Sequence, residues 1–350
     1  MRRHVILEGD IPVSEIIVGR SLMSEIAQAA VGVSTRVAVL SQPSTKAYGE
    51  MIATALQSVG LNTTCHTLPD GEAAKDLAVV HDIYRVLNRA AFTREDLVIG
   101  VGGGALTDVT GFVAGTYLRG VPAMYVATTL LAAVDASIGG KTGINVDGKN
   151  LAGVFVHPQI VFSDIDVLDT LPHHLKVQGA AEAVKTGFIE DMEIVQAYEA
   201  TAVDAVDLEF IVNRSVAVKV AVVTEDFTEQ GRRAILNYGH TVGHAIETAS
   251  GMSHGEAVAI GMVSAGAASH AVTGFNGEGR QSELFGKIGL PTRVDQSIEV
   301  DRVRALMASD KKRDTSGLRM VLLKEFGVPV VEAVDDATVR VALDAVGLSP

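Results

Sequence analysis

The stretch LVIGVGGGALTD, residues 97–108, decides the fold of the N-terminal half. An apolar run typical of a buried strand leads into three consecutive glycines and then into a helical pattern. This arrangement lets backbone N–H groups approach a phosphate at a helix N-terminus with no Cβ in the way. Gly100, Gly102 and Ala105 also fit the spacing of the dinucleotide fingerprint, but no acidic residue stands at an obvious strand end about twenty residues further on. The alternative is a glycine-rich turn that only packs closely.

Other apolar runs surround this strand in the sequence. They occupy residues 36–41, 122–129 and 159–164. Because helical patterns separate these runs, we expect a parallel sheet covered by helices. After about residue 175, long helical patterns follow one another, with few strand signals until LRMVLL at 318–323. The sequence therefore predicts an α/β domain over residues 1–174 and a mostly helical domain over residues 175–350.

The composition limits the kind of partner and the chemistry of any metal site. A formal charge of −13 argues against nucleic acid or an anionic membrane as the main partner. The single cysteine, Cys65, excludes an intrachain disulfide and a cysteine-based zinc cluster, so a metal must bind through histidine and carboxylate. The sequence shows neither the pattern of a signal peptide nor a long uninterrupted apolar span, and we expect a soluble, cytoplasmic protein.

A second glycine-rich stretch, ATTLLAAVDASIGGKTGINVDGKN, covers residues 127–150. Lys141 and Lys149 stand there among glycine, threonine and asparagine instead of other charged residues. These neighbours favour an anion-binding loop, although the spacing is not that of a P-loop. The alternative is a pair of solvated lysines in an exposed loop.

Three histidines follow in LNYGHTVGHAIETASGMSHGEAV, residues 236–258. His240 and His244 are four residues apart, so on a helix their rings leave the same face and can converge on one ion. His254 follows a short break at the start of the next helical pattern. Histidines with a carboxylate suit zinc, and three protein ligands leave a position open for substrate. Isolated core histidines are the alternative, but three within fifteen residues favour a metal site.

Several longer motifs resemble the 3-dehydroquinate synthase family of sugar-phosphate cyclases, in the order that the family has them. They are PDGEAAK, GGKTGIN, GKNLAG, AEAVKTG, LNYGHTVGHAIE, HGEAVAIGM and DKKRDTSGLRMVLL. The resemblance implies a Rossmann-like domain that binds NAD over residues 1–174, and a helical domain that binds metal and substrate over residues 175–350. It also implies a cleft between the two domains and a homodimer.

The resemblance further implies a carbon–oxygen lyase of the shikimate pathway, which leads to the aromatic amino acids. Its substrate would be 3-deoxy-D-arabino-heptulosonate 7-phosphate and its products 3-dehydroquinate and phosphate. NAD would take a hydride from the substrate and return it within the turnover, with phosphate elimination between the two steps. Zinc or cobalt would act as a Lewis acid. Ring opening and an intramolecular aldol closure would complete the reaction.

Carried over residue by residue, the resemblance assigns the roles in the site. The expected metal ligands are Glu182, His240 and His254, whereas His244 would stand beside the substrate. The remaining expected catalytic or substrate-binding residues are Arg119, Asp135, Lys141, Asn150, Lys185, Lys219, Arg233, Asn237 and Lys311, with Lys312 as the alternative to Lys311. The expected cofactor contacts are Asp70, Glu72, Lys75, Gly102, Gly103, Gly104, Asp108, Thr128, Thr129, Lys141, Lys149 and Thr170. Glu256 is expected to serve the start of a helix or to support the site from behind the ligands.

Two departures from the family pattern concern the cofactor and substrate loops. Position 107 is threonine in the glycine-rich turn, where it fits if it opens the helix and otherwise crowds the pyrophosphate. The loop INVDGKN is shorter than in relatives, which bears on the positions of Lys149 and Asn150.

Three other functions share the scaffold that the resemblance implies. A sister cyclase would act on sedoheptulose 7-phosphate or glucose 6-phosphate, but a neutral sugar would leave Arg233 without a carboxylate to bind. A metal-dependent polyol dehydrogenase would release reduced cofactor. A silent sugar-phosphate sensor would keep the fold without the chemistry, and the intact Lys141, Glu182, His240 and His254 speak against it.

Overall fold

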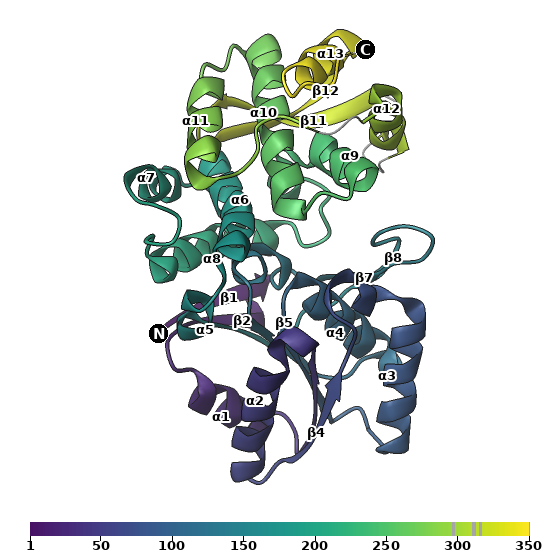
Figure 1. Ribbon diagram of the computed structural model, residues 1–350. Helices are drawn as coiled ribbons and strands as arrows, with labels where there is room; N and C mark the ends of the chain where they lie inside the picture. Colours follow the sequence, from purple (N-terminus) through teal and green to yellow (C-terminus); the bar gives the residue numbers. More distant parts are fainter. Residues whose placement is uncertain (296–297, 310–312, 315–316, 350) are drawn as a thin grey trace. The chain divides into compact units, whose positions relative to one another are not determined.

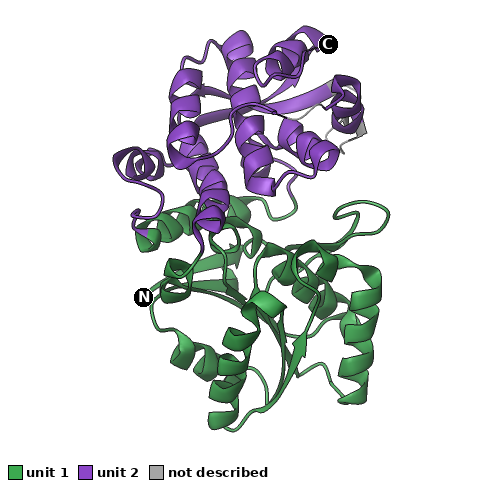
Figure 2. Ribbon diagram, in the orientation of Figure 1, with its two compact units in different colours: residues 1–171, 208–228 green, residues 172–207, 229–350 purple. Residues whose placement is uncertain are grey.

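The computed structural model describes residues 1–295, 298–309, 313–314 and 317–349. The chain forms two compact units, coloured separately in Figure 2. Unit 1 consists of Met1–Leu171 and Leu208–Thr228, and unit 2 of Pro172–Asp207 and Glu229–Pro350. Lys311 and Lys312, which the sequence offered as alternatives for substrate binding, lie outside the described residues.

Unit 1 is built on a seven-stranded sheet with the order β1-β2-β9-β6-β5-β3-β4 (Figure 1). Its strands are β1 Arg2–Glu8, β2 Ile11–Gly19, β3 Arg36–Ser41, β4 Asn62–Thr67, β5 Leu97–Gly102, β6 Ala123–Ala127 and β9 Ile160–Asp164. All neighbouring strands pair in parallel except β1, which pairs antiparallel with β2. The predicted parallel sheet is confirmed, and the N-terminal hairpin at its edge is an addition that the sequence analysis did not predict.

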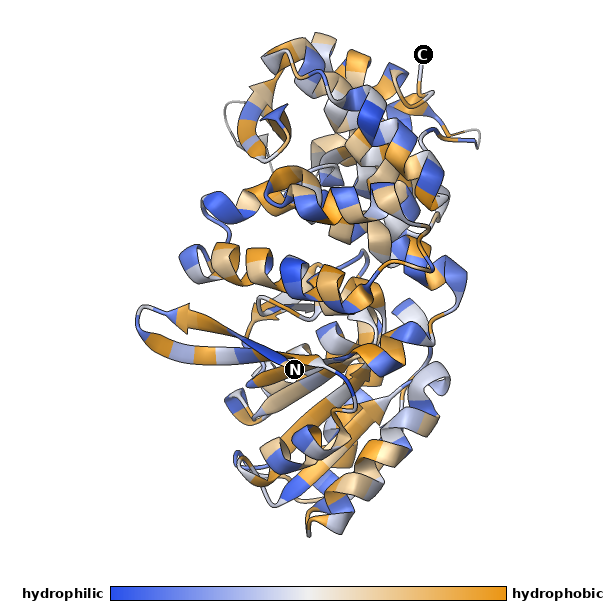
Figure 3. Ribbon diagram, turned by 90° about the vertical axis from the view of Figure 1, so that its left-hand side faces the viewer, coloured by the Kyte–Doolittle hydropathy of each residue, from blue (hydrophilic) through white to orange (hydrophobic). Residues whose placement is uncertain are grey.

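The central strands of this sheet form the core of unit 1. Every residue of β5 and β6 is buried, as expected for parallel strands covered on both faces. Figure 3 shows hydrophobic residues running along the strands of this sheet. The remaining elements of the unit are α1 Met23–Val31, α2 Lys46–Ser58, α3 Leu77–Arg89, α4 Gly104–Thr116, α5 Ile165–Asp169, α8 Leu208–Glu225, the short helices η1 Pro43–Thr45, η2 Gly71–Lys75, η3 Tyr117–Arg119 and η4 Ala132–Ala136, and the hairpin strands β7 Lys141–Ile144 and β8 Ala152–Phe155.

The glycines of β5 allow helix α4 to pack directly on the strand. A Cβ on Gly100 would lie 2.3 Å from Thr110 Oγ1, and one on Gly102 would lie 2.5 Å from Leu106 Cδ2. Both partners belong to α4, so these two glycines are needed for close strand–helix packing. Gly103 and Gly104 then form the turn itself, with Gly103 in the N-cap position of α4.

Helix α8 returns from the second half of the chain to unit 1. It packs against β1, β2 and η4. Thr224 Oγ1 accepts a hydrogen bond from the backbone N–H of Leu7 at 3.3 Å, and Asn213 Oδ1 lies 3.1 Å from His4 Nε2. A single domain boundary near residue 175 would assign α8 to the C-terminal domain. The structure assigns α8 to unit 1, and so differs from the predicted boundary at this helix.

Unit 2 is mostly helical, as predicted. Its elements are α6 His173–Ile189, α7 Met192–Ala200, η5 Arg232–Asn237, α9 His240–Ser250, α10 His254–Thr273, α11 Glu278–Ile288, α12 Val300–Ser309, α13 Asp336–Asp344 and the antiparallel strands β10 Arg313–Asp314, β11 Gly317–Glu325 and β12 Val328–Val334. The predicted strand at 318–323 lies within β11. Among the described residues, no helix combines the length and apolar character needed to cross a membrane.

Two helices of unit 2 cross at glycines. A Cβ on Gly261 of α10 would lie 2.0 Å from the carbonyl oxygen of Gly239 and 2.9 Å from the Cα of Gly243. Gly239 has φ +80, which favours glycine, and it directly precedes α9. The backbones of α9 and α10 therefore pack in direct contact at these glycines.

Candidate metal centre and cofactor residues

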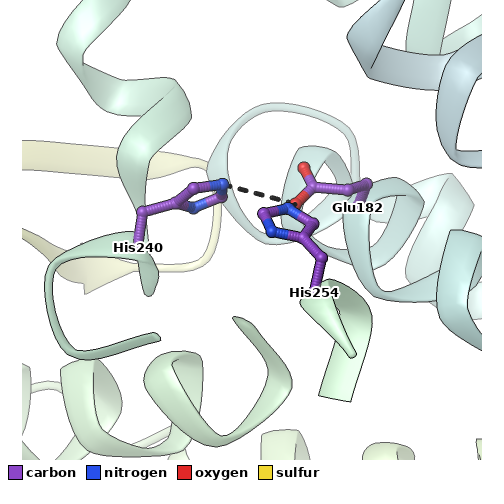
Figure 4. A group of neighbouring side chains, drawn as sticks. All are labelled: Glu182, His240 and His254. Carbon is purple, nitrogen blue, oxygen red and sulfur yellow. Dashed lines mark hydrogen bonds and ion pairs between the residues drawn. The ribbon is translucent and has the colours of Figure 1, made fainter. Parts of the chain in front are cut away.

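Three side chains of unit 2 converge on one point. Glu182 comes from the middle of α6, and His240 and His254 are the first residues of α9 and α10. Glu182 Oε1 lies 3.4 Å from His240 Nε2 and 3.2 Å from His254 Nε2. Figure 4 shows both rings and the carboxylate turned toward one another.

The spacing of these atoms fits a tetrahedral metal site. Zinc binds nitrogen and oxygen at about 2.1 Å, so two ligand atoms of a tetrahedral site lie about 3.4 Å apart. The two measured N···O distances match that separation. One ligand atom from each of the three residues lies within 4.8 Å of the others. The donor set of two imidazoles and a carboxylate also suits zinc or cobalt.

The charge of Glu182 is compensated inside the unit. Its side chain is fully buried, and the ammonium of Lys185, one helical turn away, donates a hydrogen bond to Glu182 Oε2. Burial opposes ionisation, but Lys185 and His240 hold the pKa of this carboxyl well below its usual range. With Oε2 occupied by the ammonium, Oε1 is the oxygen that faces the histidines.

The two histidines differ in protonation. Burial lowers the pKa of His240, and Glu182 offsets this only in part. Burial also opposes protonation of His254, but hydrogen bonds to Glu182 and Glu247 outweigh it and raise its pKa to about 10. Burial therefore favours the neutral form of His240, whereas the two carboxylates favour the protonated form of His254.

His244 stands beside this group without being part of it. Its ring meets that of His240 edge to face, with the centroids 5.0 Å apart. A second set of ligand-capable atoms contains His244 with Glu247 and His254. The four-residue spacing alone pointed to His240 and His244 as the ligand pair, whereas the structure groups His240 with Glu182 and His254.

Helix α10 begins with a capping box formed by Ser253 and Glu256. Glu256 Oε2 accepts from the backbone N–H of Ser253 at 3.2 Å, and its carboxylate also meets the Ser253 hydroxyl. The sequence analysis expected Glu256 to serve a helix start or support the site, and the first alternative is confirmed. The cap fixes the first turn of α10, which carries His254.

A polar cluster of unit 1 lies next to the glycine turn. Lys75 is buried, and its Nζ lies 2.7 Å from Asp108 Oδ2 and donates a hydrogen bond to Asn150 Oδ1. Burial raises the pKa of Asp108 to about 6, although the Lys75 ammonium opposes the shift. Asn150 adopts φ +56, and its backbone N–H donates to Asn145 Oδ1. Residues from η2, α4 and the 145–150 loop thus meet at the start of α4.

The glycine turn has features that suit a phosphate-bearing cofactor. Gly103 caps a helix of 13 residues, α4, whose first N–H groups carry the positive end of the helix dipole. The backbone N–H of Thr128 donates a hydrogen bond to the carbonyl of Gly102. The hydroxyl of Thr128 is buried and has no hydrogen-bond partner among the described residues. Because buried polar groups usually have a hydrogen-bond partner, this hydroxyl is available to a polar group of a bound molecule.

Comparison with known proteins shows the family to which this chain belongs. The N-terminal model of the 3-dehydroquinate synthases matches residues 65–178 and the C-terminal model matches residues 179–313. The 3-dehydroquinate synthase of Thermobifida fusca is 40% identical over 348 residues, which cover 96% of this chain and 94% of that protein. The chain belongs to the 3-dehydroquinate synthase family. The Synechocystis 3-dehydroquinate synthase is also 40% identical, over 90% of this chain and 91% of its own length.

Solved structures of related cyclases share the fold of this family member. A 2-deoxy-scyllo-inosose synthase complexed with carbaglucose-6-phosphate, NAD+ and Co2+ superimposes with a TM-score of 0.88 at 25% identity, covering 98% of this chain and 99% of that chain. The 2-epi-5-epi-valiolone synthase of Streptomyces hygroscopicus, with NAD+ and Zn2+ bound, gives a TM-score of 0.87 at 25% identity, covering 95% of this chain and 96% of that one. The sister cyclases are thus less similar in sequence than the synthases.

The remaining site residues expected from the family resemblance lie in both units. In unit 1, Asp135 of η4 is paired with the buried Lys219 of α8, whose Nζ also lies 2.6 Å from the Asp135 carbonyl oxygen. In unit 2, Arg233 is buried within η5, and Asn237 at the end of that helix donates to Glu229. The exposed positions are Asp70, Glu72, Arg119, Lys141, Lys149 and Thr170, and Thr129 follows the buried Thr128.

The two departures from the family pattern can be located. Thr107 lies in the first turn of α4, where its hydroxyl donates to the Gly104 carbonyl at 2.9 Å. Its side chain is thus turned back onto the helix, as expected if threonine is to fit there. In the 144–150 loop, the Asn150 side chain accepts a hydrogen bond from Lys75, while Lys149 is exposed.

Sequence reasoning missed Glu247. Its Oε2 lies 3.1 Å from His254 Nδ1, on the side of the ring away from Glu182. Its signal was available, because Glu247 follows His240 by seven residues and therefore shares one face of α9.

Proposed function

We propose that this chain is a 3-dehydroquinate synthase, which converts 3-deoxy-D-arabino-heptulosonate 7-phosphate into 3-dehydroquinate and phosphate. The observation that carries the proposal is the convergence of Glu182, His240 and His254 in a chain 40% identical to a synthase over nearly its whole length. The sister cyclases, at 25% identity, support the scaffold more than the substrate.

The proposal assigns NAD to residues 1–174 and a divalent cation, zinc or cobalt, with the substrate to residues 175–350. When bound, NAD would exchange a hydride with the substrate, and the cation would act as a Lewis acid toward its oxygens. The fit of the ligand atoms to a tetrahedral site and the buried Thr128 hydroxyl support these two cofactors.

The residues of unit 1 would bind and orient the nucleotide and part of the substrate. The glycine turn at 102–104 would receive the pyrophosphate, with Lys75 and Asp108 beside it. Lys219 and Asp135 hold each other in place, which keeps a buried ammonium available for a substrate oxygen. The further proposed contacts of this unit are Asp70, Glu72, Arg119, Thr128, Thr129, Lys141, Lys149, Asn150 and Thr170.

The residues of unit 2 would hold the cation and the substrate acid. Glu182, His240 and His254 are the proposed ligands. Arg233 is the proposed partner of the substrate carboxylate, because a buried guanidinium binds a carboxylate through two parallel hydrogen bonds. His244 and Asn237 would contact substrate hydroxyls, and Lys185 acts from behind Glu182. Lys311 completes the proposed set.

The enzyme is further proposed to work in the cytoplasm as a homodimer. The identity to the 3-dehydroquinate synthases supports these two points, which size measurement and cell fractionation would test.

Phosphate release tests the main proposal. Protein loaded with NAD and zinc should release phosphate from 3-deoxy-D-arabino-heptulosonate 7-phosphate without net formation of NADH. A chelator should abolish the release, and zinc or cobalt should restore it. Release from sedoheptulose 7-phosphate or glucose 6-phosphate, with none from the acid, would identify a sister cyclase. Net NADH formation would identify a polyol dehydrogenase.

A further inference from the structure

We propose that Glu247 is a positioning residue of the metal centre, which accepts a hydrogen bond from His254 Nδ1 and thereby directs His254 Nε2 toward the cation. The inference rests on the proposed function only in that it takes the cation to bind at Glu182, His240 and His254. It names a residue outside the set that the sequence resemblance supplied.

The contacts of His254 differ at its two ring nitrogens. Nδ1 lies 3.1 Å from Glu247 Oε2, and Nε2 lies 3.2 Å from Glu182 Oε1. The Glu247 side chain is 13% exposed, so little water competes for its hydrogen bond. The imidazole is thus held between two carboxylates, one of which is a proposed ligand.

The second nitrogen of His240 is held in a comparable way. Its Nδ1 lies 3.1 Å from the carbonyl oxygen of Tyr238. Because a carbonyl oxygen only accepts, this nitrogen donates, and the lone pair of a neutral His240 is on Nε2. An ionised Glu247 has the same consequence for His254. Both rings then present Nε2 to the same point, which is the arrangement that a cation needs.

Glu247 supports its histidine more strongly than the Tyr238 carbonyl supports His240, because it is a carboxylate. A carboxylate that accepts from a ligating imidazole raises the basicity of the ligand and fixes the orientation of the ring. His254 needs this support because its side chain is 30% exposed, against 9% for His240. The negative charge also offsets the positive helix end at which His254 stands, since this histidine is the first residue of α10.

A second cation bound by His244, Glu247 and His254 is the competing explanation for this cluster. The three residues do offer ligand atoms within 4.8 Å of one another. That arrangement would use both nitrogens of His254 as ligands, and the ring would have to lose both of its protons. A hydrogen bond to Glu247 leaves the Nδ1 proton in place, so we favour positioning over a second metal.

Metal affinity of the Glu247 variants tests the proposal. We expect Glu247→Ala to bind zinc about 10–100-fold more weakly in competition with a chromophoric chelator. Glu247→Gln keeps an acceptor oxygen without the charge, so its affinity should fall between those of wild type and Glu247→Ala. Glu256→Gln is the matched control, because it removes the same charge two residues from His254 while its amide oxygen still accepts from Ser253. Its affinity should equal that of wild type.

Two further measurements separate positioning from a general structural role. In the zinc-loaded protein, nitrogen NMR should find the His254 proton on Nδ1, and in Glu247→Ala the ligand-field absorption of the cobalt form should change. Unchanged zinc affinity in a folded Glu247→Ala variant would overturn the proposal, as would two zinc ions per chain that fall to one in that variant. These measurements do not involve substrate. The inference therefore fails separately from the assignment of the reaction.

Discussion

Replacing Lys185 with methionine tests how the buried charges of unit 2 compensate one another. The Lys185 side chain is 2% exposed, and its ammonium donates to the fully buried carboxylate of Glu182. Removing one partner of a buried ion pair costs about 3–5 kcal/mol, because the other charge stays buried. Glu182 keeps its contact with His254, so we expect a loss near the lower limit, about 3 kcal/mol, in the metal-free protein.

Scanning calorimetry with a chelator and with excess zinc measures this effect. For a unit of about 150–250 residues, 1 kcal/mol shifts Tm by about 2–4 °C, so the metal-free transition of unit 2 should fall by about 6–12 °C. A bound cation supplies positive charge beside Glu182. In excess zinc, the loss caused by Lys185→Met should therefore be clearly smaller.

Lys176→Met on the same helix is the control, because this lysine is only partly buried. It should change stability by about 0.5 kcal/mol or less. An equal fall in Tm with and without zinc would refute the reasoning, because Lys185 would then act by packing and not by charge. An unchanged Tm in the metal-free variant would refute it as well.

Three further predictions concern the ligands, the protons and the helix crossing. His240→Ala and His254→Ala should lose stoichiometric zinc, whereas His244→Ala should keep it, because the structure groups only the first two histidines with Glu182. Metal analysis after desalting checks this. Loss of zinc in His244→Ala alone would contradict the prediction. Zinc must displace the proton that His254 holds with a pKa of about 10. The apparent zinc affinity should therefore rise about tenfold per pH unit between neutral pH and that pKa. A zinc affinity that is independent of pH would contradict this prediction. Gly261→Ala should lower the free energy of unfolding by about 1–3 kcal/mol or more, because its Cβ would lie 2.0 Å from the Gly239 carbonyl oxygen. Gly286→Ala in α11, with open space around it, should instead stabilise by about 0.5–1 kcal/mol, and urea unfolding compares the two.

The sequence predicted those parts of the fold that are written in local patterns. The apolar run and the glycine turn that follows it correspond to β5 and the start of α4, and LRMVLL lies within β11. Helix α8 was predicted as a helix but not as part of unit 1. Its assignment depends on partners in β1 and η4 that are distant in sequence, such as Asp135 for Lys219. A helical pattern shows that one face is apolar, but not which surface covers that face.

The site was predictable to the extent that motifs carry it. Helical spacing alone favoured His240 and His244, because it compares only residues on one helix. His254 reaches the same point from a second helix, and Glu182 from a third, so their meeting depends on tertiary packing. The resemblance supplied these two residues, whereas it assigned no role to Glu247, the last residue of the motif LNYGHTVGHAIE. Its contact becomes visible only when α9 and α10 are placed side by side.

The crossing of α9 and α10 joins the stability of unit 2 to the geometry of its metal site. His240 and His254 are the first residues of the two helices, and the helices touch where Gly261 meets Gly239. Gly239 directly precedes His240, so a side chain at position 261 would displace the backbone that carries a proposed ligand. The N···O distances of 3.2 and 3.4 Å therefore depend on this backbone packing as well as on the side-chain torsions. A variant at this crossing that still folds should lose zinc affinity although every ligand is present.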